Sequence, residues 1–179
     1  MVIYKSFGDN EVLKGISGKF EPGLTNLIIG GSGSGKTTLL KCMIGLHHPE
    51  RGSVTYDGRD FTQMSTEERI EVRKEIGMLF QGSALFDSMT VEENIMFPLN
   101  MFTDQSRSEK LDRVNFCLER VNLEGKNNLF PAELSGGMKK RVGIARAIAM
   151  NPKYLFCLDR KSTRLNSSHS GESRMPSSA

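Results

Sequence analysis

The chain has 179 residues, of which 37% are hydrophobic and 25% charged, and its formal net charge is +3. This length and balance suit one soluble globular domain with a sizeable core, and they exclude a disordered or fibrous chain. Most of the net charge lies near the end, where Arg160, Lys161, Arg164 and Arg174 outnumber Asp159 and Glu172. The main body is therefore nearly neutral and lacks the basic stripe of a nucleic-acid-binding protein, so we expect no nucleic-acid partner.

Cysteine usage and the lack of long apolar runs indicate the compartment. Cys42, Cys117 and Cys157 are widely spaced and stand in apolar or helical contexts, which favours buried reduced thiols and a cytosolic protein. No basic segment followed by an apolar run opens the chain, and no apolar run approaches the roughly 20 residues needed to span a bilayer. We expect neither an export signal nor a membrane-spanning helix.

Strand and helix signals alternate along the first half of the chain, which predicts an α/β fold. Residues 11–23 have the pattern of two short antiparallel strands that end at a Pro-Gly turn, and residues 24–30 form a short apolar run that predicts a strand. A helix should follow over residues 35–46, a strand and turn over 52–58, and a buried strand over 76–81.

Helix starts are marked by three capping boxes, which pair Ser65 with Glu68, Thr90 with Glu93, and Ser106 with Glu109. The helices that follow the second and third boxes interrupt the strand alternation, so we expect an inserted helical subdomain over about 88–135. One of its helices carries an apolar face that predicts packing against neighbours and that comprises Leu111, Val114, Cys117, Leu118 and Val121.

The strongest chemical signal is the stretch GGSGSGKTT at residues 30–38, which fits G-x-x-x-x-G-K-[ST] between a predicted strand and a predicted helix. Glycines without a Cβ atom let consecutive backbone N–H groups converge on phosphate oxygens, and the helix N-terminus adds about half a positive charge. Lys36 should bridge the β and γ phosphates, and Thr37 should place its hydroxyl on Mg²⁺. The alternative is a flexible Gly/Ser loop with an incidental lysine, which the complete pattern disfavours.

A second anion-binding signal lies in LSGGM at residues 134–138. Ser135 is a natural N-cap for an amphipathic helix, and Gly136 and Gly137 leave its backbone bare. One nucleotide cannot easily use two phosphate cradles about a hundred residues apart, unless the second cradle serves a nucleotide bound to a neighbouring copy. A capped helix with a glycine turn is the alternative, and these three residues alone do not decide between the two interpretations.

With these motifs in place, the chain resembles the ATP-binding subunits of ABC transporters over nearly all of residues 1–157. The motifs follow the family's order: Phe7 matches its adenine-stacking aromatic, residues 30–38 its Walker A motif, Gln81 its Q-loop, and residues 134–138 its signature. The resemblance implies a RecA-like P-loop NTPase core with a small antiparallel β subdomain and a helical subdomain. It also implies a head-to-tail dimer with ATP between the Walker A motif of one copy and the Ser135 loop of a second ATPase subunit.

Site residues and partners follow from the same resemblance. Gln81 would contact Mg²⁺ or the attacking water and couple the site to a transmembrane permease subunit, with the chain peripheral to the cytoplasmic face of the bacterial inner membrane. The string GSALFDSMTVEEN at 82–94, and Met138 in place of the usual glutamine, resemble the branch that transports phospholipids or related lipids with Mce-type lipid-binding proteins. The expected ATP-binding residues are Phe7, Gly30, Ser32, Gly33, Ser34, Gly35, Lys36, Thr37, Thr38, Ser135, Gly136 and Gly137, and the expected Mg²⁺ contacts are Thr37 and Gln81.

The chain departs from the family's pattern after the apolar run at 154–158. Family members continue into the Asp-Glu pair of the Walker B motif, with Asp at position 158 and Glu at 159, whereas this chain has Leu158, Asp159 and Arg160. A leucine supplies no metal ligand, and a cation is electrostatically unfavourable beside Mg²⁺. Loss of a general base alone typically lowers a rate by roughly 10² to 10⁴, and the family's switch histidine is absent as well. We expect this chain not to hydrolyse ATP.

Residues 159–179 contain no Val, Ile, Phe, Tyr or Trp and are rich in serine, so burial cannot offset the entropy of ordering them. Segments 159–169 and 172–179 resemble the in-frame translation of a common short-read sequencing adapter. We therefore expect an incomplete ATPase domain over 1–158 and a non-native disordered tail over 159–179. Two alternatives are a soluble ABC-type ATPase that acts on nucleic acid, for which no basic face or second cassette is visible, and a misassembled sequence without function, which resequencing would identify.

Overall fold

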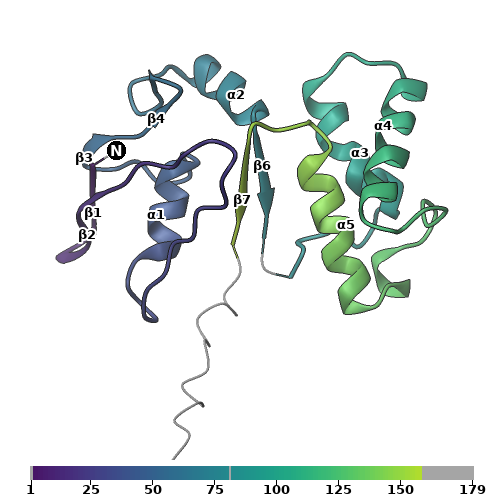
Figure 1. The fold of residues 1–179 in the computed structure, drawn as a ribbon, viewed down its shortest axis with the longest axis horizontal. Helices are drawn as coiled ribbons and strands as arrows, with labels where there is room; N and C mark the ends of the chain where they lie inside the picture. Colours follow the sequence, from purple (N-terminus) through teal and green to yellow (C-terminus); the bar gives the residue numbers. More distant parts are fainter. Residues whose placement is uncertain (1, 81, 159–179) are drawn as a thin grey trace, which may run out of the picture.

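The computed structural model describes residues 2–80 and 82–158, so Gln81 and the predicted tail lie outside the described residues. Figure 1 shows two groups of elements on either side of a central parallel strand pair. In chain order the elements are β1 (Val2–Phe7), β2 (Asn10–Ser17), α1 (Lys36–Met43), β3 (Arg51–Ser53), β4 (Thr55–Tyr56), β5 (Arg59–Asp60), α2 (Thr66–Lys74), β6 (Ile76–Leu79), α3 (Val91–Phe102), α4 (Arg107–Arg120), the 3-10 helix η1 (Pro131–Glu133), α5 (Gly136–Ile148) and β7 (Tyr154–Cys157). The predicted α/β fold class is confirmed.

A small antiparallel sheet with strand order β2-β1-β3 opens the chain. The prediction of two strands within 11–23 is wrong, because β2 is one strand that pairs along β1 from Val2 opposite Ser17 to Phe7 opposite Asn10. Because β1 runs beside nearly the whole of β2, the segment pairs with β1 as one strand and does not fold back on itself to form two. The predicted turn after β4 is confirmed: Asp57 and Gly58 have φ values of 48° and 79°, which suit a two-residue hairpin connection to β5.

The first group of elements encloses one hydrophobic core between this sheet, α1 and α2. The Tyr56 hydroxyl donates to the Met43 carbonyl at 2.8 Å, and the Tyr56 ring makes edge contacts with Phe61 and Tyr154. Burial raises the pKa of Tyr56, so this hydroxyl stays a donor over the whole physiological pH range. The buried residues of this core are Ile3, Leu13, Leu39, Cys42, Met43, Val54, Tyr56, Phe61 and Val72.

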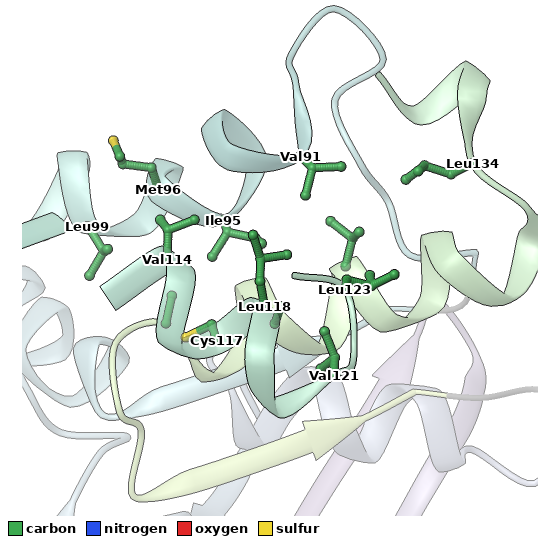
Figure 2. Packing of buried hydrophobic residues seen from close by; sticks show 13 residues of the cluster. Val91, Ile95, Met96, Leu99, Val114, Cys117, Leu118, Val121, Leu123 and Leu134 are labelled. Atoms are coloured by element: carbon green, nitrogen blue, oxygen red, sulfur yellow. The ribbon is translucent and has the colours of Figure 1, made fainter. Parts of the chain in front are cut away.

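The second group packs α3, α4 and α5 around a separate hydrophobic core (Figure 2). The predicted apolar face of α4 is confirmed, since Val114, Cys117 and Leu118 are almost fully buried. All three predicted capping boxes form, with Ser65, Thr90 and Ser106 each accepting the expected backbone N–H group. The same core continues past residue 135 into α5, through its buried Val142 and Ala145 among others, and the predicted subdomain boundaries stay predictions.

Two arginines fasten the ends of α4 and α5 to each other. From α4, Arg113 donates to the carbonyl oxygens of Ile148 and Ala149 at 2.7 and 2.8 Å, at the C-terminal end of α5. From α5, Arg141 donates to the carbonyl oxygens of Val121 and Asn122 at 3.1 and 2.9 Å, at the C-terminal end of α4. Each guanidinium therefore satisfies carbonyls that lack intrahelical partners and lies at the negative end of the neighbouring helix dipole.

The strands β6 and β7 pair in parallel at the centre of the molecule (Figure 1). A continuous apolar run such as 154–158 is typical of a strand buried on both faces of a parallel sheet. That expectation is wrong for β7, because Leu155 is 51% exposed and Cys157 is exposed as well. Among the described residues β7 pairs only with β6, so one of its edges has no neighbouring strand. Of the three cysteines expected to be buried, only Cys42 and Cys117 are.

The predicted strand over 24–30 is absent. Leu24, Leu27 and Ile29 are 68%, 72% and 75% exposed, and no strand within the described residues pairs with this segment. A strand is stabilised by hydrogen bonds to a neighbouring strand, so an apolar run without a partner remains irregular. In the same described residues, no helix is long and apolar enough to cross a membrane.

Asn94, a polar residue in α3, is fully buried. Its side-chain amide donates to the carbonyl oxygens of Phe86, Met89 and Thr90 at 2.9–3.1 Å, and its side-chain oxygen accepts the Phe86 N–H at 2.9 Å. Buried amides are stable only when their hydrogen bonds are made, and here one side chain satisfies four backbone groups. Asn94 therefore holds the loop before α3 against that helix.

Asn94→Ala should lower the free energy of unfolding by about 2 to 3 kcal/mol, because it leaves buried backbone groups of the loop without partners. Urea denaturation followed by circular dichroism measures the change. The matched control is Asn115→Ala, which removes an exposed hydrogen bond to Asn127 and should alter stability by no more than about 0.5 kcal/mol. Equal losses in the two variants would contradict the role assigned to Asn94.

Candidate functional site

The N-terminus of α1 differs from that of every other α-helix in the described part of the chain. Ser65, Thr90, Ser106 and Ser135 cap α2 to α5 with side-chain oxygens, whereas α1 follows Gly35 and has no side-chain cap. The first N–H groups of α1 are therefore not occupied by a cap, and the helix dipole places partial positive charge beside them. This end of α1 is suited to bind an anion.

Lys36, the first residue of α1, reaches back into the loop that precedes it. Its ammonium donates to the carbonyl oxygens of Gly30 and Gly31, each at 2.6 Å, and lies 3.3 Å from Ser34 Oγ. Neutral carbonyls are weaker partners for an ammonium than phosphate oxygens, because phosphate carries a net negative charge that attracts the cation, whereas a carbonyl group offers only a dipole. The loop thus holds a cation at its centre that a phosphate group can attract.

The glycines of this loop serve two different purposes. A Cβ atom on Gly35 would lie 3.0 Å from Leu13 Cδ2 and 3.1 Å from the Val12 carbonyl, and Gly35 also has φ = 86°, so packing against β2 requires glycine here. A Cβ atom on Gly31 or Gly33 would meet nothing within 4 Å. Packing within the chain explains neither residue, although the φ of 78° at Gly33 favours glycine there. The space beside both residues is open to a ligand.

The described residues match only part of the expected Mg²⁺ site. Mg²⁺ is usually held by one or two protein oxygens together with phosphate oxygens and water, and the exposed hydroxyl of Thr37 fits that role. Gln81, the other expected contact, lies outside the described residues. Leu158 donates its N–H to the Leu79 carbonyl at 2.8 Å at the end of the strand pair, and its apolar side chain supplies no ligand. Within the described segments no cluster of three acidic, histidine or cysteine side chains is placed to hold a metal ion.

The start of α5 is the second expected cradle. Ser135 Oγ accepts the Met138 N–H at 3.2 Å, so this helix is capped from within. A Cβ atom on Gly136 would meet nothing within 4 Å, and one on Gly137 would only reach Ser135 Oγ at 4.0 Å. As at Gly31, nothing in the chain itself requires glycine at these positions.

The two cradles lie on opposite sides of the central strand pair, at the edge of the molecule where the carboxyl ends of β6 and β7 also point (Figure 1). In α/β proteins, ligands bind at the carboxyl ends of parallel strands. The start of α5, which Ser135 caps, therefore lies on the edge where α/β proteins bind ligands, across the strand pair from the start of α1. The structure does not bring the two helix starts of one chain together.

Phe7, the expected adenine-stacking residue, lies at the end of β1 and is 47% exposed. Its ring makes an edge contact with His47 at 5.3 Å, and the Lys5 ammonium lies 5.3 Å from the ring centre. His47 follows the C-terminal end of α1, so a nucleotide that uses both Lys36 and Phe7 would lie along this helix. The role of Phe7 stays a prediction.

Sequence reasoning missed three residues near these sites. His47 contacts Phe7, Asn94 holds the loop before α3, and Arg146 of α5 donates to the Ser83 carbonyl in the same loop. Asn94 and Arg146 were weak signals, because polar and charged residues also occupy neighbouring positions of their helices and because the partners of both side chains are backbone atoms of a loop.

Comparison with known proteins gives consistent matches. The profile of the family described as ABC transporter matches residues 13–160. The chain is 42% identical over 153 residues to a probable ribonucleotide transport ATP-binding protein from Mycobacterium leprae, and the match covers 86% of this chain and 44% of that protein. It is 48% identical over 130 residues to a methionine import ATP-binding protein from Geobacillus kaustophilus, covering 73% of this chain and 38% of that one. The chain thus spans less than half the length of these curated relatives.

Solved structures agree with this fold. The match to CbiO1 from Clostridium perfringens, described as part of an ABC transporter complex, has a TM-score of 0.78 at 30% identity and covers 87% of this chain and 62% of that chain. A dimeric ATP-binding cassette in a post-hydrolysis state, bound to ADP and phosphate, matches with a TM-score of 0.76 at 32% identity, over 90% of this chain and 75% of that chain.

Proposed function

The chain belongs to the ABC transporter family, and we propose on this basis that it is an ATP-binding subunit. Residues 30–38 would bind the triphosphate of ATP. The observation that carries the proposal is the uncapped N-terminus of α1, with Lys36 folded into the loop in front of it. An incoming phosphate would take over the Lys36 ammonium from two carbonyl oxygens and accept hydrogen bonds from the free N–H groups.

The remaining roles are proposed from the resemblance to the family. The open space beside Gly31 and Gly33 would admit phosphate oxygens close to the backbone, together with the hydroxyls of Ser32, Ser34 and Thr38. Thr37 would hold Mg²⁺ with Gln81 and the β and γ phosphates, and the bound ion would neutralise phosphate charge. Phe7 would stack on the adenine. Because Leu158 occupies the position of the family's metal-binding aspartate, binding should not lead to turnover in this chain.

Lys36→Ala should weaken ATP binding at least roughly 10-fold, because one charge-assisted hydrogen bond to phosphate contributes about 1.5 to 3 kcal/mol. Calorimetric titration of the purified chain with ATP and Mg²⁺ measures the affinity. Lys41→Ala, in the last turn of the same helix, is the control and should bind ATP nearly as the parent chain does. No ATP affinity in the parent chain would refute the proposed function, and phosphate release abolished by Lys36→Ala would refute the absence of turnover.

We also propose that the start of α5 completes the site of a second copy. Gly136 and Gly137 are open to solvent, and the chain's own packing does not explain them. The start of α5 lies across the strand pair from the start of α1 (Figure 1), so it would not reach phosphates bound at α1 of the same copy. A head-to-tail dimer would bring Ser135 of one copy to the triphosphate held by the other, and one of the solved relatives is described as dimeric.

The parent chain should therefore double its mass when saturated with ATP and Mg²⁺, and Gly137→Asp should remain monomeric because the added carboxylate repels the triphosphate. Light scattering coupled to gel filtration measures the mass. An acidic residue in the first turn favours a helix, so the free energy of unfolding of this variant should be unchanged or slightly raised. Gly18→Asp, at another open position, is the control and should dimerise. A parent chain that stays monomeric would contradict the proposal.

The proposed setting is the cytoplasmic face of the bacterial inner membrane, where the chain would bind a transmembrane permease as a peripheral subunit. The relatives named above are described as transport or import proteins, and CbiO1 as part of a transporter complex. For the cargo we propose phospholipid or a related lipid, with an Mce-type partner, from the string at 82–94 and from Met138 alone. Ribonucleotide and methionine, which those relatives' names mention, are the other candidates.

The cargo assignment is tested by purifying the chain from its own cells with its membrane partner and by analysing extracted lipids by mass spectrometry. A bound lipid in excess over bulk membrane composition is expected, since a lipid transporter must hold its cargo away from the bilayer. A complex that binds methionine or ribonucleotide in a titration, and retains no lipid, would overturn the assignment.

A further inference from the structure

The segment that directly follows Gln81 has an unusual backbone. Gly82, Ser83 and Ala84 have φ values of 78°, 68° and 45°, so three consecutive residues adopt the left-handed conformation. Only glycine enters this region without cost, and each of the two other residues adds strain of order 1 kcal/mol or more. Such a conformation persists only where surrounding contacts hold it.

Helix α5 supplies contacts at the start of this segment. Ser83 is 2% exposed, and a Cβ atom on Gly143 would lie 3.2 Å from Ser83 Cβ and 3.1 Å from Leu79 Cδ1. Glycine at position 143 therefore lets α5 approach the segment closely. Three residues further along α5, Arg146 donates from Nη2 to the Ser83 carbonyl oxygen at 2.8 Å.

The same arginine also reaches the other end of the segment. Its guanidinium carbon lies 5.7 Å from the centre of the Phe86 ring, within cation–π range. Phe86 is held in turn by Asn94, which bonds both its N–H and its carbonyl. Residues 83–86 are thus fixed between α5 and α3.

Burying the guanidinium of Arg146 at this position costs free energy. It is partly buried, no carboxylate within the described residues forms an ion pair with it, and burial lowers its pKa. Taking a charge out of water without a counter-ion costs free energy, and an apolar side chain of similar length is often as stable or more stable in such a place. Stability of the fold alone therefore does not explain an arginine here, whereas its contacts do hold the segment in position.

We propose that Arg146 is a positioning residue that fastens the strained segment 82–86 to α5, the helix that begins at the Ser135 cradle. Through this contact the chain immediately after Gln81 follows the position of α5. The inference rests on the proposed function for its consequence, since Gln81 is the proposed Mg²⁺ contact and α5 carries the proposed contact with the second copy's nucleotide. One residue would then link the two.

Hydrogen exchange tests the fastening directly. In Arg146→Met, amide exchange at residues 83–86 should rise at least 10-fold, while exchange in the buried parts of α3 and α4 stays unchanged. Arg146→Lys, which retains one donor, should show a smaller rise. The matched control is Arg141→Met on the same helix, which removes two hydrogen bonds to Val121 and Asn122 but does not touch the segment, and exchange at 83–86 should not change.

Nucleotide binding tests the consequence. Mg²⁺ should raise the ATP affinity of the parent chain, and in Arg146→Met this gain should fall at least 3-fold while the affinity measured in EDTA is unchanged. A purely structural role would lower both affinities together. Arg141→Met should retain the full Mg²⁺ effect, and Arg146→Lys should recover part of it.

The outcomes separate the two proposals. Unchanged exchange at 83–86 in Arg146→Met, or an equal rise in Arg141→Met, overturns the fastening. If Arg146→Met does not fold, Arg146→Lys decides: a rise confined to 83–86 supports the fastening, and its absence overturns it. A parent chain that binds no ATP refutes the proposed function, whereas the exchange result still decides the role of Arg146.

Discussion

The proposed nucleotide site depends on one electrostatic arrangement. Backbone N–H groups at the N-terminus of α1 have no side-chain cap, and they lie beside Lys36, whose ammonium donates to two carbonyl oxygens and the Ser34 hydroxyl. The arrangement is useful only if the helix end is held still, and the first hydrophobic core does this. Leu39 and Cys42 anchor α1 in that core, while Gly35 allows the helix start to press against Val12 and Leu13 of β2. A side chain at Gly35 would disturb both the turn and the packing, so the residue that shapes the proposed phosphate site also constrains the fold.

The two hydrophobic cores are separate, and the central strand pair is the joint between them. Two glycines let α5 pack directly on β6: a Cβ atom on Gly77 would overlap the Ala147 carbonyl, and one on Gly143 would press on Leu79. The opposite edge of β7 has no neighbouring strand among the described residues, and Leu155 is exposed there. The strand pair therefore contacts both cores: α5 packs closely on β6, and Ile76, Tyr154 and Phe156 pack against the core that holds α1.

In the helical group, a segment with a strained backbone lies between helices that are firmly bonded to each other. Arg113 of α4 and Arg141 of α5 each donate to carbonyl oxygens at the end of the other helix and so hold the two helices together. The buried amide of Asn94 holds the loop before α3 against that helix. Between these fixed elements the backbone at Ser83 and Ala84 is held in a costly conformation. A strained segment clamped by rigid neighbours can respond sharply to a small shift of one neighbour, because packed interfaces do not deform continuously. This is the physical setting in which the contact of Arg146 acquires its proposed role.

The sequence by itself determined the features that depend on near neighbours in the chain. The glycine-rich loop that ends at the start of α1, the capping boxes at Ser65, Thr90 and Ser106, and the apolar face of α4 all follow from spacings of a few residues. The structure has the helix start, the caps and the apolar face at those positions. Only the tertiary structure decided that residues 24–30 form no strand, that Leu155 is exposed, and that Arg146 reaches Ser83. The reason is that a strand, a buried face and a side-chain contact with distant backbone exist only through a partner far along the chain, and local spacing carries no information about which partner is present.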